Sequence, residues 1–204
     1  NNTFYDWKNL LLNERINVII KIKQNLIDDR IESAKEITSE MGKPLSESKL
    51  EIDKCIWLCD YYIDNSEDML KSDFIETEAN KSYVSYEPLG IILGIMPWNF
   101  PFWQVFRFVI PTIISGNVTV VKHAPNVTGC CLRLENIFSK NELLDNIMLY
   151  WLTNSAASSA AFASSMWPPS VFTNNINLGL VIEGGEQIDM VESLTTLTSS
   201  VAGR

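Results

Sequence analysis

The sequence lacks two features that would point to common classes of partner: a run of basic residues and a long uninterrupted apolar segment. Its 204 residues carry 16 Lys or Arg against 25 Asp or Glu, a formal net charge of −9. An acidic chain without a Lys/Arg-rich run is a poor candidate for wrapping nucleic acid. No apolar stretch reaches the length that spans a membrane. We therefore expect neither nucleic acid nor a membrane among the partners.

Residues that commonly bind metals are also few. The chain has a single histidine and four cysteines, which are Cys55, Cys59, Cys130 and Cys131. A metal site made of these four is the alternative, but their spacing matches no standard zinc pattern, so we expect buried or half-buried thiols. The first six residues lack the basic stretch and apolar core of a signal peptide, which favours a cytoplasmic protein.

The first part of the chain has the apolar periodicity of helices. Apolar residues recur at helical spacing between residues 7 and 41, and Asp28-Asp29 marks a candidate division into two helices. Gly42, followed by Pro44, is a stop signal for the second of them. We interpret these helices as structural elements that pack against the rest of the protein.

A third helix is predicted from about Ser48 to Met69. Ser48 and Glu51 have the spacing of a capping box, in which both side chains bond to the first turn of the helix. Apolar residues follow at helical spacing. This helix, too, is interpreted as packing.

The middle of the chain alternates between strands and helices. Residues 81–87 alternate as a strand does, and the next four segments are predicted as strand, helix, strand and helix, at residues 90–96, 102–114, 118–122 and 128–138. A strand–helix–strand unit with a short crossover has parallel strands. The predicted fold class is therefore α/β.

Ligands of parallel α/β sheets bind at the carboxyl ends of the strands. The loop at residues 96–101, which we call the Asn99 loop, follows the end of one predicted strand, and Lys122 ends the next. We therefore expect this loop and Lys122 to lie at the same edge of the sheet, in one crevice.

Residues 94–101 read Gly-Ile-Met-Pro-Trp-Asn-Phe-Pro, and Asn99 is the one polar side chain among them. A carboxamide held in such surroundings is a hydrogen-bond donor directed at a ligand. The alternative is a turn Asn that bonds to the local backbone. The segment resembles the corresponding loop of the aldehyde dehydrogenase superfamily, and the run at residues 40–45, Glu-Met-Gly-Lys-Pro-Leu, resembles a helical turn of the same family.

The resemblance implies a role for several residues. In the family this loop lines the nicotinamide cofactor, and its Asn stabilises the oxyanion, which would make Asn99 catalytic. Lys122 would contact the ribose hydroxyls of the adenosine. The other cofactor-binding residues implied by the match are Ile95, Met96, Pro97 and Trp98.

The resemblance also implies an architecture. It predicts a partial Rossmann-like parallel sheet of the aldehyde dehydrogenase cofactor domain, with an N-terminal helical region at residues 1–80. Residues 81–87 would be a strand of the arm that pairs subunits in a homo-oligomer, and residues 88–204 a partial NAD(P)-binding domain. The family uses a variant Rossmann fold without the G-x-G-x-x-G fingerprint, which this sequence also lacks. Residues 139–188 have the least regular pattern.

The cofactor is expected to be NAD or NADP. Many members of the family carry a Glu three residues after the matching Lys, where a carboxylate favours NAD. Here that position is Pro125, so the choice between the two cofactors stays open. His123 is interpreted as a loop or cofactor-edge residue and not as a catalytic base.

Arg107 is the sole charged residue between Glu87 and Lys122. A charge in apolar company is costly unless it is paired, and Arg suits bidentate binding of a carboxylate. Arg107 matches the position where succinate-semialdehyde dehydrogenases bind the substrate carboxylate, and Phe100 is a second predicted substrate residue. The alternative is a structural salt bridge, with Glu87 as a candidate partner.

The nucleophilic Cys motif and the general-base Glu motif of the family are not found in these 204 residues. Glu183-Gly184-Gly185 resembles the latter but precedes the segment at residues 198–203 that resembles the family's Gly-Ser turn. We therefore expect a truncated aldehyde dehydrogenase whose catalytic domain is absent and which is inactive alone. The rival interpretation is a non-catalytic nucleotide-binding or subunit-interaction fragment.

Overall fold

The computed structural model describes residues 2–139 and 148–150. The sequence predictions for Glu183 and for the turn at 198–203 lie outside this part of the chain. So does the prediction for residues 139–188, except for residues 139 and 148–150. In order, the elements are α1 (Asn2–Lys8), α2 (Leu12–Asp28), α3 (Arg30–Met41), α4 (Leu45–Leu70), β1 (Asp73–Phe74), β2 (Tyr83–Val84), β3 (Ile91–Ile95), α5 (Trp103–Ile114), β4 (Val118–Lys122), α6 (Thr128–Ser139) and β5 (Met148–Tyr150).

The predicted division of the first helical stretch is confirmed. Helix α2 buries one apolar stripe and ends at Asp28, and α3 begins after Asp29. Gly42 ends α3 with a φ of 74°, a left-handed conformation that glycine adopts without steric cost. Trp7, expected in the same stretch as α2, belongs to a separate short helix, α1, where its indole nitrogen donates to the backbone oxygen of Ile113.

The start of the third predicted helix was wrong. Helix α4 begins at Leu45, because the backbone oxygen of Pro44 accepts the amides of Glu47 and Ser48 at 2.9 and 3.0 Å. Ser48 and Glu51 therefore lie inside the helix and form no capping box. The hydroxyl of Ser48 pairs with that of Thr38 on α3 at 2.9 Å.

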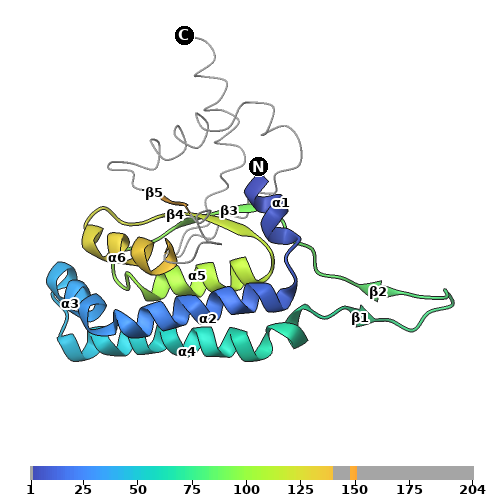
Figure 1. Cartoon of the computed structure of the whole chain (residues 1–204), viewed down its shortest axis with the longest axis horizontal. Coiled ribbons are helices and arrows are strands. Elements are labelled where there is room, and N and C mark those ends of the chain that lie inside the picture. Colours follow the sequence, from blue (N-terminus) through green and yellow to red (C-terminus); the bar gives the residue numbers. More distant parts are fainter. Residues whose placement is uncertain (1, 140–147, 151–204) are drawn as a thin grey trace, which may run out of the picture.

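The predicted parallel unit is confirmed. Strands β3 and β4 pair in parallel from Ile91 opposite Val118 to Ile95 opposite Lys122, and β5 pairs in parallel with the other side of β4. Helices α5 and α6 lie between this sheet and the layer formed by α2 and α4 (Figure 1). The structure thus places α2 and α4 behind the helices that cover the sheet, whereas α1 contacts β4.

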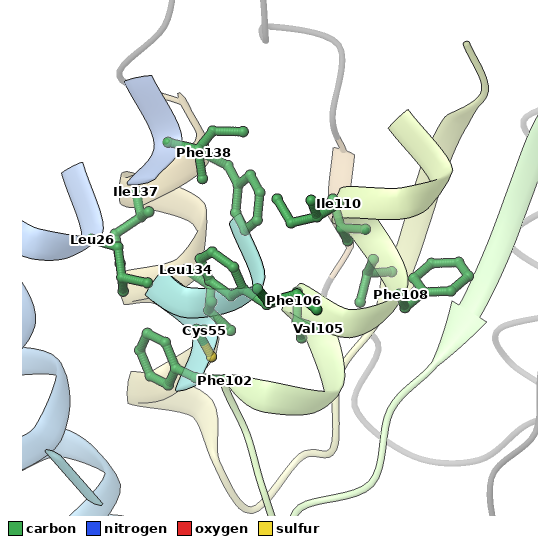
Figure 2. Packing of buried hydrophobic residues seen from close by; sticks show 14 of the residues in the cluster. Leu26, Cys55, Phe102, Val105, Phe106, Phe108, Ile110, Leu134, Ile137 and Phe138 are labelled. Carbon is green, nitrogen blue, oxygen red and sulfur yellow. The ribbon is translucent and has the colours of Figure 1, made fainter. Parts of the chain in front are cut away.

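One apolar core joins these layers. The rings of Phe106 on α5 and Phe138 on α6 pack with their centroids 5.3 Å apart, beside Cys55 of α4 and Leu26 of α2 (Figure 2). Helix α5 approaches the sheet closely at Gly94, where an added Cβ atom would stand 2.5 Å from the ring of Phe108. The small residue in β3 is therefore what allows α5 to pack on the strand.

Strands β1 and β2 form an antiparallel ribbon that projects from the body of the molecule (Figure 1). The strand predicted at residues 81–87 is found only at Tyr83–Val84, so most of that prediction was wrong. Both strands are exposed, and no apolar face is buried that would extend the pairing. Phe74 and Tyr83, which stand opposite each other, are the cross-strand pair that the ribbon contains.

Within the described residues, no helix is long and apolar enough to cross a membrane.

Candidate functional site

The Asn99 loop and Lys122 meet at the carboxyl edge of the sheet, as expected. Ile95 and Lys122 are register partners at the ends of β3 and β4. The amide of Met96 then donates to the backbone oxygen of Lys122 over 2.9 Å, so the loop leaves the sheet directly beside this lysine. Lys122 itself is half-buried.

Exposure changes sharply along the Asn99 loop. Met96 is buried and Pro97 is half-buried, whereas Trp98, Asn99 and Phe100 are exposed. The side chain of Trp98 is 52% exposed, so this apolar residue is not part of the core. The loop therefore exposes three consecutive side chains at the sheet edge, an indole, a carboxamide and a phenyl ring.

No hydrogen bond joins the carboxamide of Asn99 to any residue in the described part of the chain. The alternative of a turn Asn that satisfies its own backbone therefore finds no support there. A carboxamide that is exposed and free of such local bonds can donate to a ligand.

The backbone after Asn99 is held by Glu51 of α4. One carboxylate oxygen of Glu51 accepts the amides of Phe102 and Trp103, over 2.9 and 3.0 Å, at the start of α5. These amides have no acceptor within the helix, and the positive end of the helix dipole favours a carboxylate. Glu51 is 4% exposed, and its other oxygen pairs with the ammonium of Lys43.

Sequence analysis had missed this role of Glu51. The signal was present, since Glu51 stands on the same face of α4 as Cys55 and Leu58, three buried positions at helical spacing. Burial of an acidic residue within an apolar stripe costs free energy unless a hydrogen-bond donor or a cation pairs with it. The capping-box interpretation concealed that mismatch.

Lys43, which follows the turn at Gly42, links this ion pair to the loop. Its ammonium lies 4.5 Å from the centroid of the Phe100 ring, a cation–π distance. The side chain of Lys43 is 12% exposed, so the ammonium is largely shielded from water, whereas Phe100 is 46% exposed. Lys54 lies on α4 one turn after Glu51. Its ammonium is 3.9 Å from the centroid of the Trp103 ring, also a cation–π distance.

His123 holds the loop from the other side. Its Nδ1 accepts the amide of Ala124 at 2.8 Å, so the proton of the neutral ring sits on Nε2, which donates to the backbone oxygen of Pro101 at 2.8 Å. Burial lowers the pKa of His123, which favours this neutral form. The geometry agrees with a loop-supporting residue and not with a catalytic base.

The start of α6, after β4, is also closed by a carboxylate. Glu40 of α3 accepts the amides of Gly129 and Cys130 over 2.6 and 2.9 Å. A free helix N-terminus at this edge would be a site for phosphate. Glutamates occupy the N-termini of both α5 and α6. The pyrophosphate of a dinucleotide would therefore have to be held by other groups.

Arg107 lies on α5 between buried neighbours but is itself exposed. The premise that its charge is buried in apolar surroundings was therefore wrong. Helix periodicity explains the difference, because Phe106 and Phe108 turn towards the core and the residue between them faces outward. Arg107 lies little more than one helical turn after the start of α5, the helix that follows the Asn99 loop.

All four thiols are buried, as expected. Burial raises the pKa of Cys59 to about 12 and also raises the pKa values of Cys55 and Cys130. Such thiols are poor nucleophiles, because the thiolate is the reactive form. No group of side chains that could hold a metal ion is found among the described residues.

Comparisons with known proteins agree with this arrangement. The sequence model of the aldehyde dehydrogenase family matches residues 1–167. A probable NADP(+)-dependent succinate-semialdehyde dehydrogenase of Synechocystis sp. is 37% identical over 183 residues, which are 80% of this chain and 40% of that protein. The NAD(P)+ succinate semialdehyde dehydrogenase Sad of Escherichia coli is 41% identical over 135 residues, 66% of this chain and 29% of that protein.

The fold has similar solved structures. The crystal structure of succinic semialdehyde dehydrogenase from Streptococcus pyogenes, in complex with NADP+, superposes with a TM-score of 0.69 and 28% identity. The match covers 78% of this chain and 35% of the other. The chain thus spans less than half the length of the relatives that it matches.

Proposed function

The chain belongs to the aldehyde dehydrogenase family, and we propose that it supplies the cofactor and oxyanion side of an enzyme that oxidises an aldehyde to a carboxylic acid with NAD+ or NADP+. One observation carries this proposal. Asn99 is exposed, and no described residue binds its carboxamide, on a loop that begins beside Lys122 at the carboxyl edge of the sheet.

Each residue of the edge has a proposed role. Attack of a thiolate on the aldehyde carbon turns the carbonyl oxygen into an oxyanion, to which the amide group of Asn99 would donate a hydrogen bond. The bound dinucleotide would supply the hydride acceptor. The residues proposed to line it are Ile95, Met96, Pro97 and Trp98, with Lys122 bonding to the ribose hydroxyls.

One feature of this edge fits a dinucleotide, and a second limits where its phosphates can lie. The exposed indole of Trp98 offers an apolar surface on the loop that begins beside Lys122, and the ammonium of Lys122 is a donor for hydroxyl groups. The glutamates at the starts of α5 and α6 exclude the phosphates from these two helix ends. Named relatives use NADP+ or either cofactor, and we leave the choice open for this chain.

We propose succinate semialdehyde as the substrate, with Arg107 binding its carboxylate and Phe100 packing on its methylene groups. The names of the relatives and the exposure of Arg107 near the Asn99 loop support this proposal. The alternative is an uncharged aldehyde with Arg107 in a structural role. That alternative predicts that Arg107→Leu affects charged and uncharged aldehydes equally.

The same family membership supports the proposed organisation. Residues 1–80 would be the helical region of the cofactor domain, 81–87 part of the arm and 88–204 the partial nucleotide-binding domain. Exposed aromatic residues, Phe74 and Tyr83 on the ribbon and Tyr86 just after it, support its use as an arm that pairs subunits in a homo-oligomer. The 204 residues alone are expected to turn over no aldehyde, because the family's Cys and Glu motifs are not among them.

Isothermal calorimetry of the chain with NAD+ and with NADP+ tests the proposed cofactor site. We expect one of them to bind, and Lys122→Ala to weaken binding by about tenfold or more through loss of charged hydrogen bonds to the ribose. Lys35→Ala, which changes an exposed lysine on α3, serves as the matched control and should bind as the parent does.

Failure of both dinucleotides to bind would contradict the proposed cofactor site in this chain. Binding that is unchanged in Lys122→Ala would contradict the role of this lysine. Binding without turnover, in a protein that also contains the family's catalytic motifs, would favour the non-catalytic nucleotide-binding alternative.

A further inference from the structure

The segment that carries Asn99 is short and is anchored at both ends. On one side the amide of Met96 is bonded to β4, and on the other side three successive backbone groups are bonded to side chains from distant elements. These groups are the oxygen of Pro101, held by His123, and the amides of Phe102 and Trp103, held by Glu51. Only residues 97–100 lie between the anchors.

The free segment has little conformational freedom of its own to lose. Pro97 opens it and Pro101 closes it, and a proline ring fixes φ near −65°. No described residue bonds to the carboxamide of Asn99, so its position depends on where the loop backbone places the Cα atom and on the torsion angles of the side chain itself. Any displacement of an anchor therefore moves the carboxamide.

Glu51 is the anchor with the largest electrostatic contribution. It is a buried carboxylate that receives two backbone amides at the positive end of a helix and one lysine ammonium. Charge-assisted hydrogen bonds of this kind are about twice as strong as neutral ones. The same lysine, Lys43, contacts the Phe100 ring, so the ion pair holds the residue that directly follows Asn99 as well.

We propose that Glu51 is the positioning residue of Asn99: through the start of α5 and through Lys43 it fixes the loop so that the carboxamide meets the oxyanion. The role of Asn99 in this inference rests on the proposed function. The anchoring of the loop by Glu51 is independent of that function. Glu51 is 4% exposed, and its oxygens are taken up by two backbone amides and one lysine, so we assign it an action through the loop and no direct contact with a ligand.

The test compares Glu51→Gln with Asp53→Asn. Both changes neutralise a carboxylate on α4 that pairs with a cation, since Asp53 pairs with Arg30 over 2.5 Å. Only Glu51 contacts the loop. Glutamine retains the shape and one acceptor, so the variant should fold; circular dichroism checks this.

The first measurement is backbone hydrogen exchange on the 204-residue chain. We expect exchange of the Phe102 and Trp103 amides to accelerate about tenfold in Glu51→Gln and to stay at the parental rate in Asp53→Asn, because a neutral acceptor is weaker. Equal rates in all three proteins overturn the proposal. Glu51→Asp, which keeps the charge but shortens the reach, should show the same acceleration and replaces Glu51→Gln if the latter does not fold.

The second measurement is steady-state kinetics in the longer aldehyde dehydrogenase of which this chain is proposed to be part. We expect Glu51→Gln to lower kcat by about tenfold to a hundredfold, part of what loss of an oxyanion donor costs, with the dissociation constant of the cofactor changed less than about threefold. Asp53→Asn should leave both constants unchanged.

The two measurements separate the two hypotheses. Accelerated exchange together with unchanged kcat in an active enzyme overturns the positioning role. A parent protein that oxidises no aldehyde contradicts the proposed function, and the exchange rates then still decide whether Glu51 anchors the loop.

Discussion

The turns that follow β3 and β4 are alike in topology and opposite in what they expose. Each leads from a parallel strand into a helix whose first amides are bonded to a glutamate of the helical region, Glu51 in one case and Glu40 in the other. The first turn exposes Trp98, Asn99 and Phe100. The second turn directs His123 inward, where it supports the first.

The difference indicates that the two turns at this sheet edge have separate roles. The turn that is expected to meet the ligands has exposed side chains and an anchored backbone. The neighbouring turn, buried at His123 and Ala124, provides one of the anchors. The helical region provides the others, which explains why two of its glutamates are bonded to amides far along the chain.

The largest effect should come from the exposed carboxamide of the first turn. In an aldehyde dehydrogenase that contains this chain together with the family's catalytic motifs, we expect Asn99→Ala to lower kcat by about 10²- to 10³-fold through loss of an oxyanion donor. Its free energy of unfolding should change by less than about 0.5 kcal/mol, because the side chain makes no bond to the described residues. Kinetics and urea unfolding measure the two quantities.

Asn126→Ala is the matched control, since Asn126 is the exposed asparagine of the second turn. It should leave both kcat and stability unchanged. Equal losses of kcat in the two variants would break the comparison between the turns.

A smaller effect is expected at the second helix start. Glu40→Gln should lower the free energy of unfolding by about 1 kcal/mol, because charge-assisted capping of the Gly129 and Cys130 amides is weakened. Urea unfolding of the 204-residue chain measures this. Glu32→Gln, which alters an exposed ion pair on the same helix, should cost less than about 0.5 kcal/mol. If the two variants are equally stable, Glu40 is not the cap that the geometry indicates.

The smallest effect is a pH dependence from His123. Because burial lowers its pKa in the folded chain, the unfolded chain binds the proton more readily. The stability that this shift contributes is therefore complete above the unfolded pKa of about 6.5 and is lost as the pH falls towards the folded value. The loss over the first pH unit below that unfolded pKa should be less than about 1 kcal/mol.

His123 is the only histidine, so His123→Gln should remove this dependence. Urea unfolding of the parent and the variant, at a series of pH values from about 7 down to about 5.5, would follow the change across the ordinary titration range of histidine. A parent protein whose stability is as flat as that of the variant would indicate that His123 is not held in its neutral form.

Much of the local structure could be predicted from the pattern of residues. Apolar periodicity and turn residues predicted α2, α3, α5 and α6. The strand–helix–strand order alone predicted that the Asn99 loop and Lys122 lie at the same edge of the sheet. These features depend on near neighbours in the sequence. The ribbon was predicted less well, because a strand with no buried face leaves a weak pattern.

The charged groups of the site could not be placed in this way. Arg107 was expected to be buried and is exposed, whereas Glu51 was read as a cap of its own helix and instead binds amides 51 residues later in the chain. The identity of a charged residue does not reveal which distant group will neutralise it. That depends on which helices pack together.

The sequence by itself thus determined the elements, the parallel pairing of β3 with β4 and the composition of the loop at the sheet edge, because propensity, periodicity and chain connectivity are local properties. Only the tertiary structure decided what holds that loop. Its anchors, Glu51, Lys43 and His123, act through burial and hydrogen bonds between distant segments, and these exist only once the layers have packed.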